Sequence, residues 1–376
     1  MEQRQQRISS FFNPSLPEAR PRSDRIRCGG RESKFLALMS VVSPRAKRLR
    51  NFLLIGCTLV VVAFGILTWL ASSRLLCPAR RQLQDYHREI LGHAQEHGMR
   101  IESFVCGSTP CLLCEPISNP GAALKGNKLR TELQSAGLTL APWGEIKATL
   151  VLLHGHGGCK EDDLPIAERF CAAGFRCLLP DLPGHGQHPA PFASFGKTEN
   201  VLPSDVLREA SLRFHFQPAP AALFGISQGG AIALQAAALE DARWIAVAEL
   251  SSFASLDRIV RSQAEKWFGP FASIADGTVT RLVQARAGYA PAKIRPVDSI
   301  AKLRIPVFIG HGDADKFVAP EQAQLLYAAA AANPQRAPFF NVAGAGHSNA
   351  LVTSAPVYAS LSTFFLEALS APATKR

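Results

Sequence analysis

The sequence lacks a complete metal-binding pattern. His154 and His156 are closely spaced, but no carboxylate follows them to complete a His-x-His-x-Asp arrangement. Cys106, Cys111 and Cys114 have part of a zinc-site spacing, but neither a second cysteine pair nor a histidine partner lies nearby. We therefore expect neither a metal ion nor a cofactor.

The sequence leaves open whether its nine cysteines form disulfides or are free thiols. If the folded domain lies outside the cytoplasm, a disulfide within residues 106–114 or between Cys171 and Cys177 fits the sequence. Buried free thiols fit it equally well.

The first 50 residues lack apolar periodicity, and arginine dominates their charge. Much of the formal net charge of +11 lies there rather than in the folded part. We interpret residues 1–50 as a disordered basic tail and expect no nucleic-acid partner. Met39 and the basic residues 40–51 would form a conventional short lead. The sequence therefore leaves open whether the chain starts at Met1 or Met39, and whether residues 1–38 are translated.

Residues 52–70 lack charge altogether. About 20 such residues are enough to span the hydrocarbon core of a bilayer as a helix. A buried helix of a soluble core would normally carry a polar stripe, which this run does not. We therefore predict one transmembrane helix over residues 51–72.

The charges that flank this run favour one orientation. Basic residues cluster at 45–50, and such a flank tends to keep the N-terminus in the cytoplasm and to send the rest of the chain across the membrane. Arg74, Arg80 and Arg81, on the far side, count against it. We predict a single-pass membrane protein with an extracytoplasmic catalytic domain. A cleaved signal peptide is the alternative, although residues 70–73 match a small-x-small cleavage site poorly.

Beyond a linker or first helix at residues 73–97, the chain alternates between two kinds of segment. Short apolar runs bounded by turns, which we expect to be strands, lie at 148–154, 175–180, 221–226, 244–250, 305–310 and 338–342. Helical stretches lie at 164–173, 201–216, 228–240 and 320–332. Such alternation predicts an α/β domain, residues 98–376, whose mostly parallel sheet is covered by helices on both faces. In sheets of this type the site lies at the carboxyl ends of the strands.

The strand at 221–226 runs into a Gly-x-Ser-x-Gly motif. A strand that turns sharply into a helix needs small residues beside the turn, and Gly225 and Gly229 supply them. The residue at the apex, Ser227, is then lifted clear of the sheet at the start of the new helix. A glycine-rich turn into a buried helix is the alternative interpretation of this short motif.

The strand at 148–154 ends in a loop that suits an anion. It reads His154-Gly155-His156-Gly157-Gly158, and loops this rich in glycine let backbone N–H groups converge on a negatively charged oxygen. The next strand is followed by a structured turn at residues 180–186, whose aspartate and histidine we expect to brace the turn rather than to react.

In this order, the motifs HGHGG, DLPGHG, GISQGG, HGDADKFV and GAGH resemble the α/β-hydrolase superfamily over about residues 98–369. The resemblance implies that Ser227 is the nucleophile and that the N–H groups of His156 and Gln228 form the oxyanion hole. The family's Gly-x-x-Asp-x-x-Val pattern places the acid at Asp315, and a loop after the last strand places the histidine at His347. Asp313 is the alternative acid, although a capping or turn role suits it better.

Residues 251–303 separate two of the expected strands and are interpreted as a small helical cap. The cap contains Trp267, Phe268, Phe271 and Tyr289. These aromatic residues either form the core of the cap or also face the substrate, because caps in this superfamily line the substrate pocket.

Together these features predict a serine hydrolase that cleaves carboxylic esters, with a small-molecule or lipid-like ester as substrate. A peptidase, an amidase or a thioesterase would use the same three residues. From another class, a membrane-tethered binding protein could keep the fold without catalysis, but such proteins usually lose one of the three, and none is missing here. The sequence does not specify the acyl length or the leaving group.

Overall fold

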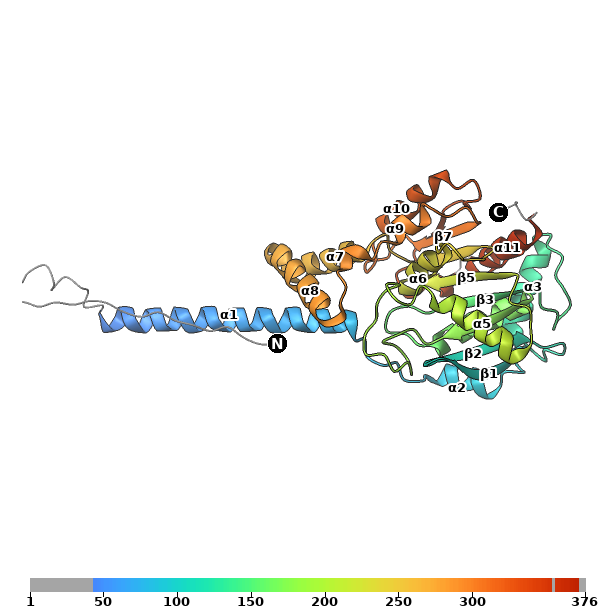
Figure 1. The fold of residues 1–376 in the computed structure, drawn as a ribbon, viewed down its shortest axis with the longest axis horizontal. Coiled ribbons are helices and arrows are strands. Elements are labelled where there is room, and N and C mark those ends of the chain that lie inside the picture. The colour runs from blue at the N-terminus through green and yellow to red at the C-terminus, as the bar shows by residue number, and fades with distance from the viewer. Residues whose placement is uncertain (1–42, 354–355, 372–376) are drawn as a thin grey trace, which may run out of the picture. The chain divides into compact units, whose positions relative to one another are not determined.

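The structure is a computed structural model that describes residues 43–353 and 356–371 of the chain (Figure 1). It divides into two units, Met1–Val61 and Val62–Arg376. Most of the predicted basic tail, and the question of the start at Met1 or Met39, lie outside the described residues.

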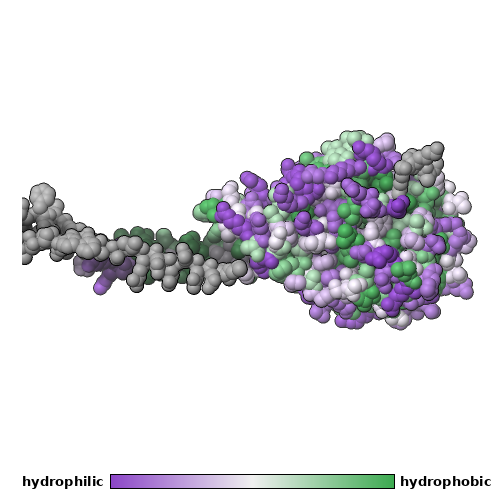
Figure 2. Space-filling view, viewed as in Figure 1, coloured by the Kyte–Doolittle hydropathy of each residue, from purple (hydrophilic) through white to green (hydrophobic). Residues whose placement is uncertain are grey.

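A single long helix, α1 (Pro44–Leu76), contains the predicted membrane span. It is 33 residues long, and it is the one helix in the described ranges with the length and apolar composition to cross a membrane. Figure 2 shows hydrophobic side chains (green) along this helix, whereas hydrophilic residues (purple) cover much of the folded body. The Ser43 hydroxyl accepts a hydrogen bond from the Ala46 N–H at the start of the helix, and Pro78 follows its end.

An eight-stranded sheet in the order β1-β2-β4-β3-β5-β6-β7-β8 forms the centre of the folded unit. Its strands are β1 (Met99–Cys106), β2 (Thr109–Pro116), β3 (Ala148–Leu153), β4 (Phe175–Pro180), β5 (Ala221–Ile226), β6 (Val247–Leu250), β7 (Val307–Gly312) and β8 (Phe340–Val342). From β4 through β8 neighbouring strands are parallel, so the predicted parallel sheet is confirmed. The antiparallel hairpin β1–β2, which pairs with β4 at the sheet edge, was not predicted.

Helices cover both faces of this sheet, as expected (Figure 1). They are α2 (Asp85–Gly92), α3 (Leu124–Ser135), α4 (Leu164–Ala172), α5 (Leu202–Phe214), α6 (Gln228–Ala237), α10 (Glu321–Ala329) and α11 (Val357–Ser370). Short 3-10 turns occur at η2 (Lys160–Asp163), η5 (Ala330–Ala332) and η6 (Ala350–Val352).

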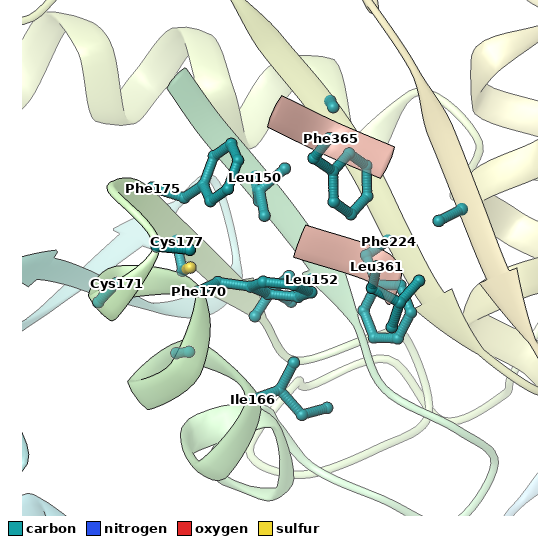
Figure 3. Packing of buried hydrophobic residues seen from close by; sticks show 14 of the residues in the cluster. Leu150, Leu152, Ile166, Phe170, Cys171, Phe175, Cys177, Phe224, Leu361 and Phe365 are labelled. Carbon is teal, nitrogen blue, oxygen red and sulfur yellow. The ribbon is translucent and has the colours of Figure 1, made fainter. Parts of the chain in front are cut away.

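The two faces bury separate cores because successive strand residues point to opposite sides. On one face, Leu150 and Leu152 of β3 pack with residues of α4 and α11, including Phe170 and Phe365 (Figure 3). On the other face, Val151 and Leu153 pack with residues of α5, α6 and α10. Both faces of β3 are thus apolar, which explains its unbroken hydrophobic sequence.

Three further helices lie between β6 and β7, where the cap was predicted: α7 (Leu256–Phe268), α8 (Ala272–Ala287) and α9 (Pro296–Ile300). The turns η3 (Gly269–Phe271) and η4 (Pro291–Lys293) join them. A third apolar cluster packs beneath α7 and α8 and includes Leu76, Phe195, Phe253 and Leu256. The last turn of α1 therefore belongs to the folded unit.

Candidate active site

Ser227 lies in the tight turn between β5 and α6, in a strained backbone conformation. Its φ of 53° and ψ of −115° lie in a region that residues other than glycine rarely adopt, and such a conformation costs about 1–3 kcal/mol. Hydrogen bonds on both sides hold it: the Ser227 N–H donates to the Leu250 carbonyl at 2.9 Å, and the Ser227 carbonyl accepts from the Ser252 hydroxyl at 2.8 Å. The surrounding structure thus fixes the direction of the Ser227 side chain.

The two glycines of the motif are required by close backbone approach. A Cβ atom on Gly225 would overlap the backbone of Gly229, and one on Gly229 would overlap the carbonyl oxygen of Leu153. The strand and the helix therefore pack closer at this turn than any side chain permits, in agreement with the reason for which the two residues were singled out.

Of the three residues predicted as nucleophile, acid and base, the histidine lies within hydrogen-bonding distance of each of the other two. His347 Nε2 is 3.0 Å from Ser227 Oγ, and His347 Nδ1 is 2.7 Å from Asp315 Oδ2. Ser227 follows β5, Asp315 follows β7 and His347 follows β8, so the carboxyl ends of three parallel strands bring them together. The carboxylate can only accept, which places the imidazole proton on Nδ1 and leaves Nε2 to accept from the serine hydroxyl.

Asp315 is buried and ionised. Its Oδ1 accepts from the N–H groups of Phe317 and Val318 at 2.8 and 2.9 Å. Burial by itself would raise the pKa of this carboxyl, but hydrogen bonds from His311, His347 and the Phe317 N–H outweigh burial and hold the pKa well below its usual range. The carboxylate is therefore available as the partner of His347 across the neutral pH range.

Asp313, the alternative acid, lies elsewhere. Its two oxygens accept from the Gly344 N–H at 2.7 Å and the Asn341 side chain at 3.2 Å, and it is exposed. It thus ties β7 to the loop after β8, and no contact joins it to His347 among the described residues.

Two buried residues behind the acid were missed in the sequence. The His311 Nε2–H donates to the Val318 carbonyl at 2.9 Å and lies 3.3 Å from Asp315 Oδ2. Glu249, fully buried on β6, accepts from the Ser252 N–H at 2.9 Å, and burial raises its pKa to about 7. A charged residue inside an apolar strand is a signal that could have drawn attention to Glu249.

The glycine-rich loop after β3 lies directly beside the predicted nucleophile. A Cβ atom on Gly155 would be 3.6 Å from both the Ser227 Cβ and the Ile226 carbonyl oxygen. Within the described part of the chain, neither the His156 N–H nor the Gln228 N–H donates to a protein acceptor. The Gln228 N–H is the first of α6, and such N–H groups have no partner inside their own helix.

His154 and the end of the same loop have structural contacts. The His154 Nδ1–H donates to the Gly155 carbonyl at 2.9 Å, and its Nε2 accepts from the Leu182 N–H at 3.1 Å. Burial lowers the pKa of His154, so it is a neutral strut between two loops. Gly157, with a φ of 75°, and Gly158 complete the turn that aims this loop.

The His156 side chain connects this loop to α1. Its Nε2–H donates to the Arg74 carbonyl at 3.0 Å, and its Nδ1 lies 2.8 Å from the Gln228 side-chain amide. Because a neutral ring with its proton on Nε2 can only accept at Nδ1, the amide nitrogen of Gln228 is assigned to this contact. That assignment also gives this buried nitrogen a partner. The contact to α1 was not predicted, because no pattern in either segment indicates that the two pack together.

The turn after β4 has the bracing role expected of it. Asp181 accepts from the Lys160 N–H at 2.9 Å, the Lys160 ammonium at 3.0 Å and the Gln187 N–H at 2.9 Å. His185 is buried, and its Nδ1–H donates to the Pro183 carbonyl at 2.9 Å. Neither side chain forms a hydrogen bond with Ser227, Asp315 or His347.

The cysteines in the described ranges are free thiols, Cys171 and Cys177 among them. One group of side chains, His87, Cys159 and Asp162, lies close enough to hold a metal ion. Its atoms are already in use: His87 Nδ1 accepts from the Gln84 N–H, its Nε2–H donates to Asp162, and Arg81 pairs with the same carboxylate. Burial raises the pKa of Cys159 to about 12, so its thiol is neutral.

Comparison with known proteins identifies a family for this chain. A family model described as "Alpha/beta hydrolase family" matches residues 150–359. No curated protein matches the sequence.

Solved structures share the fold at low sequence identity. An esterase from Pyrococcus furiosus has a TM-score of 0.55 and 15% identity, over 78% of this chain and 97% of that chain. An acylaminoacyl peptidase in complex with Z-Gly-Gly-Phe-chloromethyl ketone has a TM-score of 0.50 and 14% identity, over 79% and 45%. A bacterial membrane phospholipase A has a TM-score of 0.48 and 16% identity, over 86% and 100%.

Proposed function

Because this chain belongs to the alpha/beta hydrolase family, we propose that it is a serine hydrolase that cleaves carboxylic esters through an acyl-serine intermediate. The family and its esterase and peptidase neighbours support a hydrolase. The observation that carries the serine mechanism is the chain of hydrogen bonds from Ser227 through His347 to Asp315.

The proposed reaction starts with proton transfer. A serine hydroxyl is a weak nucleophile, so His347 Nε2 takes the Ser227 proton as Oγ attacks the ester carbonyl. Asp315 holds the Nδ1 tautomer and stabilises the imidazolium that forms. His347 then returns the proton to the leaving alcohol. In the second half of the reaction, His347 takes a proton from a water molecule as the water attacks the acyl carbon, and returns that proton to Ser227 Oγ as the carboxylic acid leaves.

The negative charge that develops on the carbonyl oxygen needs donors, and we assign the N–H groups of His156 and Gln228 to this role. Both amides lack a protein acceptor in the described residues, and Gly155 places the loop against Ser227. Loss of one such donor typically costs about 3 kcal/mol in the transition state. The hydrogen bond between the two side chains of the same residues supports a fixed spacing of the two amides.

A fluorophosphonate probe tests the mechanism directly. The wild-type protein should be labelled covalently, and Ser227→Ala should not, because alanine fits the turn but has no nucleophile. The matched control is Ser348→Ala, which removes an exposed serine next to His347 and should be labelled like the wild type. Absence of labelling in the folded wild type would instead favour the non-catalytic binding protein. Parallel assays with p-nitrophenyl esters, anilides and thioesters distinguish an esterase from a peptidase, an amidase or a thioesterase.

We also propose that α1 anchors the protein in a membrane as a single uncleaved span, with the catalytic domain outside the cytoplasm. Support for an uncleaved span comes from Ser72 and Ser73, which lie within the segment that matches a cleavage site poorly. Ser72 is buried, and Arg286 of α8 donates to the Ser72 and Ser73 hydroxyls at 2.9 and 2.8 Å. The basic flank at residues 45–50 supports the orientation. An alkaline-phosphatase fusion to the C-terminus should therefore be active, and an inactive fusion would place the domain in the cytoplasm.

A further inference from the structure

The turn between α7 and α8 carries a cluster of exposed large hydrophobic side chains. Trp267, Phe271 and Ile274 are 71%, 62% and 61% exposed, and they lie within eight consecutive residues. Elsewhere in the described residues after α1, exposed large hydrophobic residues lie singly along the chain. Single exposed residues are ordinary, whereas a cluster of this kind marks a surface that something apolar covers. We call residues 267–274 the α7–α8 tip.

The tip lies beside the apolar part of α1. Phe268, which adjoins Trp267, contacts Phe64 of α1 edge to face, with ring centroids 5.6 Å apart. Both residues belong to the same unit, Val62–Arg376. The tip and the Phe64 level of α1 are therefore neighbours.

The other end of α8 contacts a more polar level of α1. The Arg286 guanidinium lies 4.3 Å from the centre of the Trp69 ring, and it also donates to the hydroxyls of Ser72 and Ser73. At a rise of about 1.5 Å per residue, Phe64 lies about 8 Å from Trp69 along the helix and about 14 Å from Ser73. Along α1, the end of α8 that carries Ile274 is thus on the side of the apolar run, and the end that carries Arg286 is on the side where the run stops.

This order matches the profile of a membrane surface. The strongly apolar run of α1 ends at Leu70 and is followed within four residues by two serines and Arg74, so the boundary of the hydrocarbon falls near Trp69, a residue type that is enriched at that level. The level of Phe64 is then within the acyl chains, at a depth of the 5–10 Å that amphipathic elements reach. Lys266 has a stem long enough to keep its ammonium group among the headgroups.

We propose that the α7–α8 tip inserts into the bilayer beside α1, as a second membrane contact of this protein. The inference rests on the proposed membrane anchor, and its partner is the lipid bilayer itself. Because α7 and α8 cover the apolar cluster that contains Phe195 and Phe253, the contact brings the helices above this cluster to the lipid surface. Phe195 stacks on His156, which links that cluster to the glycine-rich loop.

Tryptophan fluorescence in proteoliposomes tests the insertion. The full chain is reconstituted into phosphatidylcholine vesicles with or without bromine atoms on the acyl chains, which quench tryptophan only on contact. Trp69→Phe leaves Trp267 to report on the tip, and Trp267→Phe leaves Trp69 to report on α1. The double variant supplies the background from Trp143 and Trp244. Leu212→Trp in the double variant is the matched control, because Leu212 is exposed on α5, a helix on the sheet.

We expect brominated lipid to quench Trp267 and Trp69, and to leave a tryptophan at position 212 unquenched. Quenching of Trp69 with no more quenching of Trp267 than of the position-212 control would overturn insertion of the tip and leave the anchor intact. If neither Trp69 nor Trp267 were quenched, the anchor itself would be wrong, and the inference would fail with it.

Discussion

The turn around Ser227 and the α7–α8 pair each contain three glycines, and the contrast between them shows how differently the two regions are built. In the turn, a Cβ atom on any of the three would press on neighbouring atoms; they are Gly225, Gly229 and Gly230. In the α7–α8 pair, a Cβ atom on any of them would meet nothing within 4 Å; they are Gly269, Gly277 and Gly288. Close backbone packing therefore specifies the turn, whereas α7 and α8 leave room on one side.

The same contrast holds for polar groups. Around Ser227, buried side chains such as Asp315 and His154 have their hydrogen-bond partners within the fold. At the tip, the exposed face is apolar, and its environment lies outside the chain. A substitution around Ser227 should therefore change kcat or the free energy of unfolding strongly. The effect of a substitution on α7 or α8 should depend on what surrounds these helices.

The largest effect should come from the acid of the proposed mechanism. In Asp315→Asn, one amide hydrogen would face His347 Nδ1 and force the imidazole into the wrong tautomer, so we expect kcat to fall by about 10⁴-fold. Asp313→Asn keeps an oxygen for the Gly344 N–H and should change kcat less than about three-fold. Steady-state hydrolysis of p-nitrophenyl butyrate measures both, and the reverse ranking would make Asp313 the acid.

The next effect is on stability, and it tests the close packing of the turn. In Gly229→Ala the new Cβ would collide with the carbonyl oxygens of Leu153 and His154, and backbone atoms cannot move aside as a side chain can. We expect the free energy of unfolding to fall by at least about 4 kcal/mol. Urea denaturation in mild detergent measures it. A loss of less than about 1 kcal/mol would mean that strand and helix separate easily, against the close packing of the turn.

Two of the three candidate-site residues that the structure brings together stand in local sequence patterns. Ser227, with its glycines, and Asp315, with the valine three residues later, each stand in a short motif because a turn of fixed shape holds them. The parallel sheet was predicted for a similar reason, since strands buried on both faces, such as β3, are apolar throughout. The family and the α/β-hydrolase fold are thereby confirmed.

What the sequence could not show are contacts between distant segments. The hairpin β1–β2 was overlooked because its cysteines were considered as ligands, although Gly107, with a φ of 58°, marks its turn. The pairing of His311 with Asp315 depends on how β7 ends, and the bond from His156 to the Arg74 carbonyl joins residues 82 positions apart. Neither contact changes hydrophobic periodicity, which is the signal that sequence interpretation relies on.

A smaller effect should appear in the pH dependence of stability, through Glu249. Burial raises the pKa of Glu249 from 4.5 to about 7, so the folded state holds a proton that the unfolded state has released. This contribution is fully present below pH 4.5 and is lost as the pH rises towards about 7. Glutamine cannot ionise, so at pH 8 Glu249→Gln should be more stable than wild type by about 3 kcal/mol.

Urea denaturation of both proteins at pH 5 and pH 8 measures this difference. The advantage of Glu249→Gln should shrink towards pH 5, because there the wild-type carboxyl is protonated in the folded state. An equal difference at the two pH values would show that His311, which faces both Glu249 and Asp315, keeps Glu249 ionised.

The smallest effect should be a gain in stability at Gly277, the glycine whose surroundings contrast most clearly with those of Gly229. Gly277 lies inside α8, three residues after Ile274, and a Cβ atom there would meet nothing within 4 Å. Alanine loses less backbone entropy than glycine on forming a helix, so Gly277→Ala should raise the free energy of unfolding by about 0.5–1 kcal/mol. The same urea titration measures it. A loss of stability instead would mean that this face of α8 already packs against something, and the contrast between close-packed turn and open helix pair would no longer hold.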